Sequence, residues 1–144
     1  MKTFTTKQLP DIAQNIIKNA LVQHSITAVV VTLSGDLGAG KTTLTQEIAR
    51  ELGVKEKVIS PTFVIFKKYK TTHPVFSTLV HIDAYRLNHS DELKKLGWNE
   101  LLEDPKNLII VEWPERVPEC IPQKHMCRIS LSHKNETERT IQFD

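Results

Sequence analysis

The sequence predicts a three-layer α/β domain with a mixed, largely parallel central sheet. Apolar, β-branched runs alternate with amphipathic segments, which is typical of buried parallel strands covered by helices on both faces. The C-terminal end is rich in short strands, and these predict antiparallel edges. A length of 144 residues fits one domain with one core, and we expect residues 1–144 to form a single unit.

The N-terminal third contains two predicted helices around one predicted strand. Residues 9–24 carry apolar residues at helical spacing, and Pro10 suits the first turn, where its missing N–H leaves no bond unmade. Residues 27–33 are too short and too β-branched for a helix and predict a buried strand. Residues 41–52 are again helical, and Gly53 suits a helix C-terminus.

The rest of the chain predicts strands and short helices in alternation. Residues 58–70 predict a short strand, a break at a proline and a strand over 63–70, which pairs with a strand over 75–83. We expect Ser90 or Asp91 to cap the next helix. The remaining predicted elements are helices ending at Leu96 and spanning 98–102, a strand at 107–112, a loop marked by Pro114, Pro118 and Pro122, and strands at 126–133 and 137–143.

Composition excludes few functions. A formal charge of +2, from 19 basic and 17 acidic residues, argues neither for nor against nucleic acid as a partner. No apolar run reaches the ~18 residues of a membrane span, and the N-terminus lacks the apolar core of a signal peptide, so we expect a cytoplasmic protein. Cys120 and Cys127 have no neighbouring metal-ligand pattern, and we expect reduced, structural thiols.

A glycine-rich turn between the first predicted strand and the second helix carries the clearest chemistry. Gly35, Gly40, Lys41 and Thr42 satisfy G-x-x-x-x-G-K-[ST], the phosphate-binding loop. Its glycines allow the backbone N–H groups to surround phosphate oxygens, and the following helix N-terminus favours an anion. The lysine would reach the β- and γ-phosphates, and the threonine hydroxyl would bind Mg²⁺. A glycine turn that merely links strand to helix is the alternative, but the strand before and the helix after favour a nucleoside triphosphate.

A second anchor for Mg²⁺ is expected at the end of a neighbouring apolar strand. Glu112 ends "LIIVE" and is the first candidate, as a metal ligand or as a group that orients water; a surface carboxylate is the alternative. Asp83 ends another apolar strand, and His81 shares its face, since alternate residues of a strand point the same way. A core histidine and a solvated aspartate remain the alternative for this pair. Arg86 either neutralises phosphate charge or pairs with a carboxylate.

Two further segments are candidates for switching or contact. Ser60, Pro61 and Thr62 place two hydroxyls around a rigid proline, where a hydroxyl would sense the γ-phosphate; an ordinary turn is the alternative. "FKKYK", residues 66–70, is basic and aromatic and suits contact with a nucleic acid or an acidic partner, although a solvated edge strand explains it as well.

Four motifs in this order, "GDLGAGKTT", "SPTF", "HIDAYRL" and "VEWPER", closely resemble the TsaE family, also called YjeE. The resemblance covers residues 9 to about 131; the tail after Leu131 is less recognisable, and no role is carried over to it. It implies a P-loop NTPase-like fold and a slow, magnesium-dependent ATPase. It also implies work with the proteins TsaB and TsaD, and through them with tRNA, in making threonylcarbamoyladenosine. Members of the family are thought to reset that complex between turnovers.

The resemblance also implies roles for individual residues. Lys41 would bind phosphates, Thr42 and Glu112 would hold Mg²⁺, and Asp83 would assist the metal or water. Ser60, Pro61 and Thr62 would form a switch-like segment, and Trp113 would pack near the nucleotide or at the partner surface. His81, Tyr85 and Arg86 belong to the same motif as Asp83. The nucleotide cradle would comprise Gly35, Asp36, Leu37, Gly38, Ala39, Gly40, Lys41, Thr42 and Thr43.

Two other functions remain open from the residues. A small-molecule or nucleoside kinase would use the same phosphate loop but transfer the γ-phosphate to a metabolite. A non-catalytic adaptor would bind ATP without turnover. GTP is disfavoured because the chain has no N-K-x-D motif for the guanine base.

Overall fold

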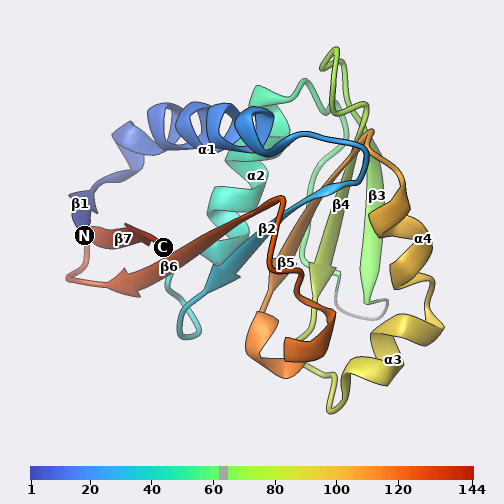
Figure 1. Cartoon of the computed structure of the whole chain (residues 1–144). Helices are drawn as coiled ribbons and strands as arrows, with labels where there is room; N and C mark the ends of the chain where they lie inside the picture. The colour runs from blue at the N-terminus through green and yellow to red at the C-terminus, as the bar shows by residue number, and fades with distance from the viewer. Residues whose placement is uncertain (62–64) are drawn as a thin grey trace.

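The computed structural model describes residues 1–61 and 65–144, and these form a seven-stranded sheet between two layers of helices (Figure 1). The strand order is β1-β7-β6-β2-β5-β4-β3. β2 pairs in parallel with β5 and β6, and β4 pairs in parallel with β5, whereas the outer pairs are antiparallel. The strands are β1 Lys2–Phe4, β2 Val29–Ser34, β3 Phe66–Lys70, β4 Thr78–Asp83, β5 Asn107–Glu112, β6 Met126–His133 and β7 Arg139–Phe143.

Helices cover both faces of the central strands. The α-helices are α1 Leu9–Gln23, α2 Lys41–Glu51, α3 Ser90–Lys95 and α4 Trp98–Glu103, and short 3-10 turns are η1 Thr6–Gln8, η2 Pro114–Arg116 and η3 Pro118–Cys120. α1 and α2 share one hydrophobic core with one face of the sheet, and α3 and α4 share a second core with the other face. This arrangement confirms the predicted α/β class and its mixed sheet, parallel in the centre.

Strand alternation assigns each residue of the central strands to one of these cores. On β5, Leu108 and Ile110 belong to the core beneath α1 and α2, whereas Ile109 and Val111 belong to the core beneath α3 and α4. Because successive side chains point to opposite faces, Glu112 follows Leu108 and Ile110 onto the α2 side. The polar residues at the ends of these strands are therefore aimed by the same alternation that builds the core.

Parallel pairing brings the carboxyl ends of β2, β4, β5 and β6 to one edge of the sheet. The loop between β2 and α2 lies at this edge, and ligands of open α/β sheets bind outside the carboxyl ends of the strands. The termini of the chain lie together beside β1 and β7 (Figure 1). Because β7 is antiparallel to β6 and β1 to β7, the start of β7 and the end of β1 lie at this edge too.

Most predicted elements are confirmed, but local geometry corrects several bounds. Residues 58 and 59 form no strand, and β3 begins at Phe66, while residues 63 and 64 lie outside the described residues. β4 begins at Thr78 and not at residue 75, because Thr71 N–H donates to the Ser77 carbonyl (3.0 Å) and holds residues 71–77 in a loop. The prediction for the helix cap was wrong. His89 precedes the first turn of α3, and Ser90 lies inside it, where its hydroxyl accepts a bond from Glu119 N–H (3.2 Å).

The C-terminal loop and the first residues add structure that the pattern did not reveal. The loop with three prolines contains η2 and η3, and residues 2–8 form β1 and η1, which were not predicted. β7 begins at Arg139, two residues later than expected.

Cys120 and Cys127 are free thiols, as predicted, and burial raises the pKa of both. Within the described ranges, no helix combines the length and the apolar character needed to cross a membrane.

Candidate functional site

The loop between β2 and α2 has a backbone that only glycine accommodates at its two ends. Gly35 has a φ of 148°, and a Cβ there would lie 2.4 Å from the Leu131 carbonyl oxygen on β6. Gly40, immediately before α2, has a φ of 101°. Side chains rarely adopt such positive φ values, so these two glycines allow the turn and the close approach of β6. The first turn of α2 then presents unpaired N–H groups at the loop.

Lys41 folds back across this loop. Its side chain is buried, with the residue only 5% exposed, and Nζ donates to the carbonyls of Gly35 (2.5 Å) and Asp36 (2.9 Å). Nζ also lies 4.3 Å from the ring centre of Trp113, within cation–π range. No carboxylate pairs with Lys41 among the described residues. The cation is thus held inside the loop by neutral groups that an anion can replace.

Glu112 meets the start of α2 in a buried setting. The residue is 2% exposed, and Thr42 Oγ1 lies 3.3 and 3.4 Å from its two carboxylate oxygens. His81 Nε2 hydrogen-bonds the same carboxylate from β4, and His81 Nδ1 is buried without a partner among the described residues. The alternative of a surface carboxylate does not describe Glu112. Its charge lies between a hydroxyl and an imidazole.

Asp83 lies directly beside Glu112, because the two residues are opposite one another in the β4–β5 register. Ser60 Oγ donates to Asp83 Oδ2 (3.2 Å), and Tyr85 N–H donates to Asp83 Oδ1 (3.0 Å). Ser60, the first residue of the predicted switch-like segment, therefore reaches this carboxylate. Pro61 is buried, whereas Thr62 lies outside the described residues.

Aromatic side chains border the same region. The Tyr85 ring packs on Trp113 with centres 5.0 Å apart, and the Arg116 guanidinium lies 5.4 Å from the Tyr85 ring. Trp113 has a positive φ of 59°, which turns the chain immediately after Glu112. Arg86 is exposed and does not contribute to the cavity described next.

Two cavities meet at the loop. The first, about 310 Å³, is lined by the loop together with Ser60, Asp83, Glu112, Trp113 and Arg139. The second, about 530 Å³, lies between the loop, the N-terminal segment and the β6–β7 hairpin. Its lining residues are Phe4, Thr5, Thr6, Lys7, Leu9, Ala39, Gly40, Thr43, Glu136, Thr137 and Arg139. Sequence reasoning missed the contribution of both chain ends, since no motif distinguishes them.

The donor set at the edge fits Mg²⁺. Oxygen atoms of Thr42 and Glu112 adjoin one another, with Asp83 on the next strand. Across residues 1–61 and 65–144, no group of three or more His, Cys, Asp or Glu side chains forms a metal-binding cluster. Mg²⁺ typically takes one or two protein carboxylates and completes its shell with water and substrate phosphates, so this sparse set suits it.

The fold and this edge together define an α/β domain of the P-loop NTPase type. A profile described as "Threonylcarbamoyl adenosine biosynthesis protein TsaE" matches residues 4–141. The chain belongs to the TsaE family, whose members act in the biosynthesis of threonylcarbamoyladenosine in tRNA.

Individual relatives agree with this assignment. The chain is 40% identical over 114 residues to a Bacillus subtilis protein named tRNA threonylcarbamoyladenosine biosynthesis protein TsaE, covering 79% of this chain and 68% of that one. A Mycobacterium bovis protein of the same name is 40% identical over 67% of this chain and 60% of its own length. The crystal structure of Bacillus subtilis YdiB superposes with a TM-score of 0.69 at 29% identity, covering 99% of this chain and 83% of that chain.

Proposed function

We propose that the protein is a magnesium-dependent ATPase that supports threonylcarbamoyladenosine modification of tRNA by binding and resetting a complex of TsaB and TsaD. One observation carries the proposal: Lys41, Thr42 and Glu112 converge where a glycine-rich loop enters α2. Membership of the TsaE family supports the pathway. The ATPase activity and the two partners are our inference from the site and the resemblance.

Phosphate binding would use the loop's own groups. The backbone amides of residues 36–42 and the N-terminus of α2 would surround the β- and γ-phosphates. Lys41 would exchange the carbonyls of Gly35 and Asp36 for phosphate oxygens. This exchange is favourable because hydrogen bonds between two charged groups are stronger than bonds to a neutral carbonyl.

Thr42 and Glu112 would hold Mg²⁺, which when bound neutralises the negative charge that the triphosphate brings to the site. His81 fixes the orientation of the Glu112 carboxylate through its hydrogen bond. Asp83, held by Ser60 and by the backbone of Tyr85, would orient the attacking water or a water bound to the metal. Trp113 and Tyr85 would restrict water at the phosphate end.

The nucleoside would occupy the cavity of about 530 Å³ beside the loop. This cavity shares Gly40 and Thr43 with the cavity of about 310 Å³ at the loop, which we call the phosphate cavity, so a ligand seated on the loop would extend directly into it. Phe4 and Leu9 provide apolar contact for a base, and nearby threonines provide hydroxyls for a ribose.

Coupling to partners would pass through the segment that contains Ser60. Its bond to Asp83 joins this segment to the centre of the site, so hydrolysis of the nucleotide would alter the surface that a partner contacts. We expect this cycle to run in the cytoplasm, together with the tRNA-modifying complex.

The test is to measure phosphate release from ATP by the protein alone and then with its cognate TsaB, TsaD and tRNA. We expect slow turnover alone and faster turnover with the complex. Binding of ATP without turnover in either condition would indicate an adaptor. Phosphate transfer that depends on a small-molecule acceptor would indicate a kinase.

A further inference from the structure

Arg139 lies where the two cavities meet. It is among the residues that line the phosphate cavity and among those that line the adjoining cavity, together with Gly40 and Thr43. A nucleotide that extends from one cavity into the other would pass all three residues. Gly40 and Thr43 belong to the loop and α2, whereas Arg139 comes from the far end of the sequence.

Strand pairing explains this position. β6 runs parallel to β2, so the turn after β6 projects from the same edge as the phosphate loop. Arg139 is the first residue of β7 after that turn and pairs with Phe4 of β1, which also lines the larger cavity. The position of Arg139 is therefore fixed by the sheet itself.

The guanidinium is oriented but lacks a counter-charge. Arg139 Nη1 donates to the carbonyls of Asn135 (2.9 Å) and Glu138 (3.1 Å). The nearby carboxylate of Glu138 pairs with Lys134 (3.5 Å), and no ion pair among the described residues includes Arg139. Because a guanidinium has five N–H donors, Nη2 and Nε remain for a ligand.

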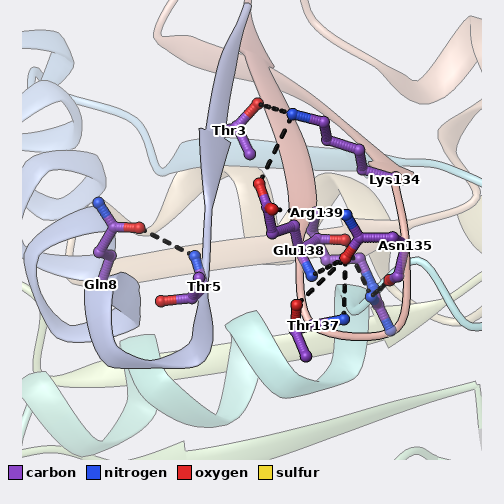
Figure 2. A network of polar contacts seen from close by, with 8 residues as sticks. All are labelled: Thr3, Thr5, Gln8, Lys134, Asn135, Thr137, Glu138 and Arg139. Carbon is purple, nitrogen blue, oxygen red and sulfur yellow. Dashed lines mark hydrogen bonds and ion pairs between the residues drawn. The ribbon is translucent and has the colours of Figure 1, made fainter.

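The turn that carries Arg139 is held rigidly by its own side chains (Figure 2). Asn135 Oδ1 accepts bonds from the N–H groups of Thr137 (3.0 Å) and Glu138 (2.9 Å), and Lys134 also donates to Thr3 Oγ1 (3.3 Å) on β1. A group held in place before binding loses little conformational freedom when the ligand arrives. These contacts suit a binding residue better than a freely moving surface arginine.

We propose that Arg139 binds the α-phosphate of a nucleoside triphosphate, the phosphate nearest the ribose, while the loop holds the β- and γ-phosphates. The inference rests on the proposed function, since it assumes that the loop holds the terminal phosphates. The planar fork of arginine matches two phosphate oxygens at once. Arg139 would bind the ligand and take no part in bond cleavage.

The test compares the affinity for the magnesium complex of β,γ-imido-ATP, a non-hydrolysable ATP analogue, with the affinity for magnesium pyrophosphate, whose two phosphates fill only the two positions on the loop. Both are measured by calorimetry on the purified protein. Arg139→Ala should weaken binding of the ATP analogue about 10- to 100-fold, the range for losing a hydrogen bond to a charged group, and pyrophosphate binding less than about threefold. Arg139→Lys keeps the charge without the fork and should lose less affinity for the ATP analogue than Arg139→Ala. Arg128→Ala is the matched control, because Arg128 is exposed on β6 and lines a different cavity.

Each of three affinity results would overturn the inference: unchanged affinity for the ATP analogue in Arg139→Ala, an equal loss for the analogue and pyrophosphate, or an equal loss in Arg128→Ala. Lys41→Ala separates this inference from the proposed function. If wild type and Lys41→Ala bind the ATP analogue equally, the proposed function fails. If Lys41→Ala loses affinity and Arg139→Ala does not, only the role of Arg139 fails.

Hydrogen exchange on the wild type is a further test that avoids any folding defect of a variant. The ATP analogue should slow exchange in residues 134–139, and unchanged exchange there would contradict the proposal.

Discussion

At the amino ends of the parallel strands, buried and half-buried polar side chains bond to nearby backbone, whereas at the carboxyl ends Thr42, His81 and Glu112 bond to one another beside a cavity. Asn107, at the start of β5, donates from Nδ2 to the Leu101 carbonyl (3.0 Å). In the loop before β4, Thr71 Oγ1 donates to the Phe76 carbonyl, and His73 Nδ1 accepts bonds from Val75 and Phe76 (both 3.1 Å).

The carboxyl ends differ in charge as well as in partners. Among the described residues, Lys41 and Glu112 are buried there, Lys41 hydrogen-bonds only to carbonyls, and His81 Nδ1 has no partner. Burying charged groups is costly unless a ligand or partner compensates them. This difference supports our proposal that the carboxyl edge of the sheet binds a ligand while polar groups at the amino edge stabilise the fold, so substitutions at the two edges should affect different measurements.

The largest expected effect is on ATP turnover in Lys41→Ala. Removing the cation that would contact the β- and γ-phosphates should reduce turnover by about 100- to 1000-fold or more. Phosphate release at saturating Mg-ATP is the measurement, and Lys18→Ala, an exposed lysine on α1, is the control. Retained turnover would mean that phosphate is handled elsewhere in the molecule.

The next effect separates chemistry from binding at Glu112. Glu112→Ala should cut turnover more than nucleotide affinity, because this carboxylate would act through the metal or water while the loop amides supply most of the affinity. Glu112→Gln keeps the size of the side chain and an oxygen for the bond from His81. Turnover and Kd should be measured on both variants, and equal losses of the two quantities would make Glu112 chiefly structural or chiefly an affinity ligand.

A crossed pair of variants tests the division between the edges. Asn107→Ala should lower the free energy of unfolding by about 1–3 kcal/mol, because the buried Leu101 carbonyl loses its donor, and should leave turnover per folded molecule unchanged. Thr42→Val should have the opposite pattern: it should greatly reduce turnover and lower the free energy of unfolding by less than about 1 kcal/mol. Denaturant unfolding and phosphate release on both proteins provide the measurements. If both variants changed both quantities alike, the two edges would not differ in role.

The smallest expected effect is a pH dependence of stability from His73. Burial lowers the pKa of His73 from its ordinary 6.5, and both backbone bonds need Nδ1 unprotonated. The unfolded chain therefore takes up the proton first. The stability that neutral His73 contributes is present above pH 6.5, and it is lost as pH falls from there through the lower pKa of the folded protein. His73→Asn, whose side-chain oxygen can accept the same bonds, should reduce the loss of stability between about pH 7.5 and 5.5. An identical pH profile in wild type and variant would exclude His73 as the source.

What the sequence determined by itself is local in origin. A β-branched run, glycines that permit positive φ and an amphipathic segment specify β2, the phosphate loop and α2 from contiguous residues, and the apolar strands ending at Asp83 and Glu112 were visible in the same way. Alternation along β4 also placed His81 and Asp83 on one face. These features depend on the backbone preferences of neighbouring residues, so sequence alone reveals them.

Only the tertiary structure decided which distant residues meet at that edge. The bond between His81 and Glu112, the contact of Ser60 with Asp83, and the place of Arg139 beside the loop depend on strand order and register. β1 has three residues, too few to show a pattern, and it forms because β7 offers it an edge to pair with. Pairing between residues far apart in the chain is set by the packing of the whole sheet, and no local propensity encodes it.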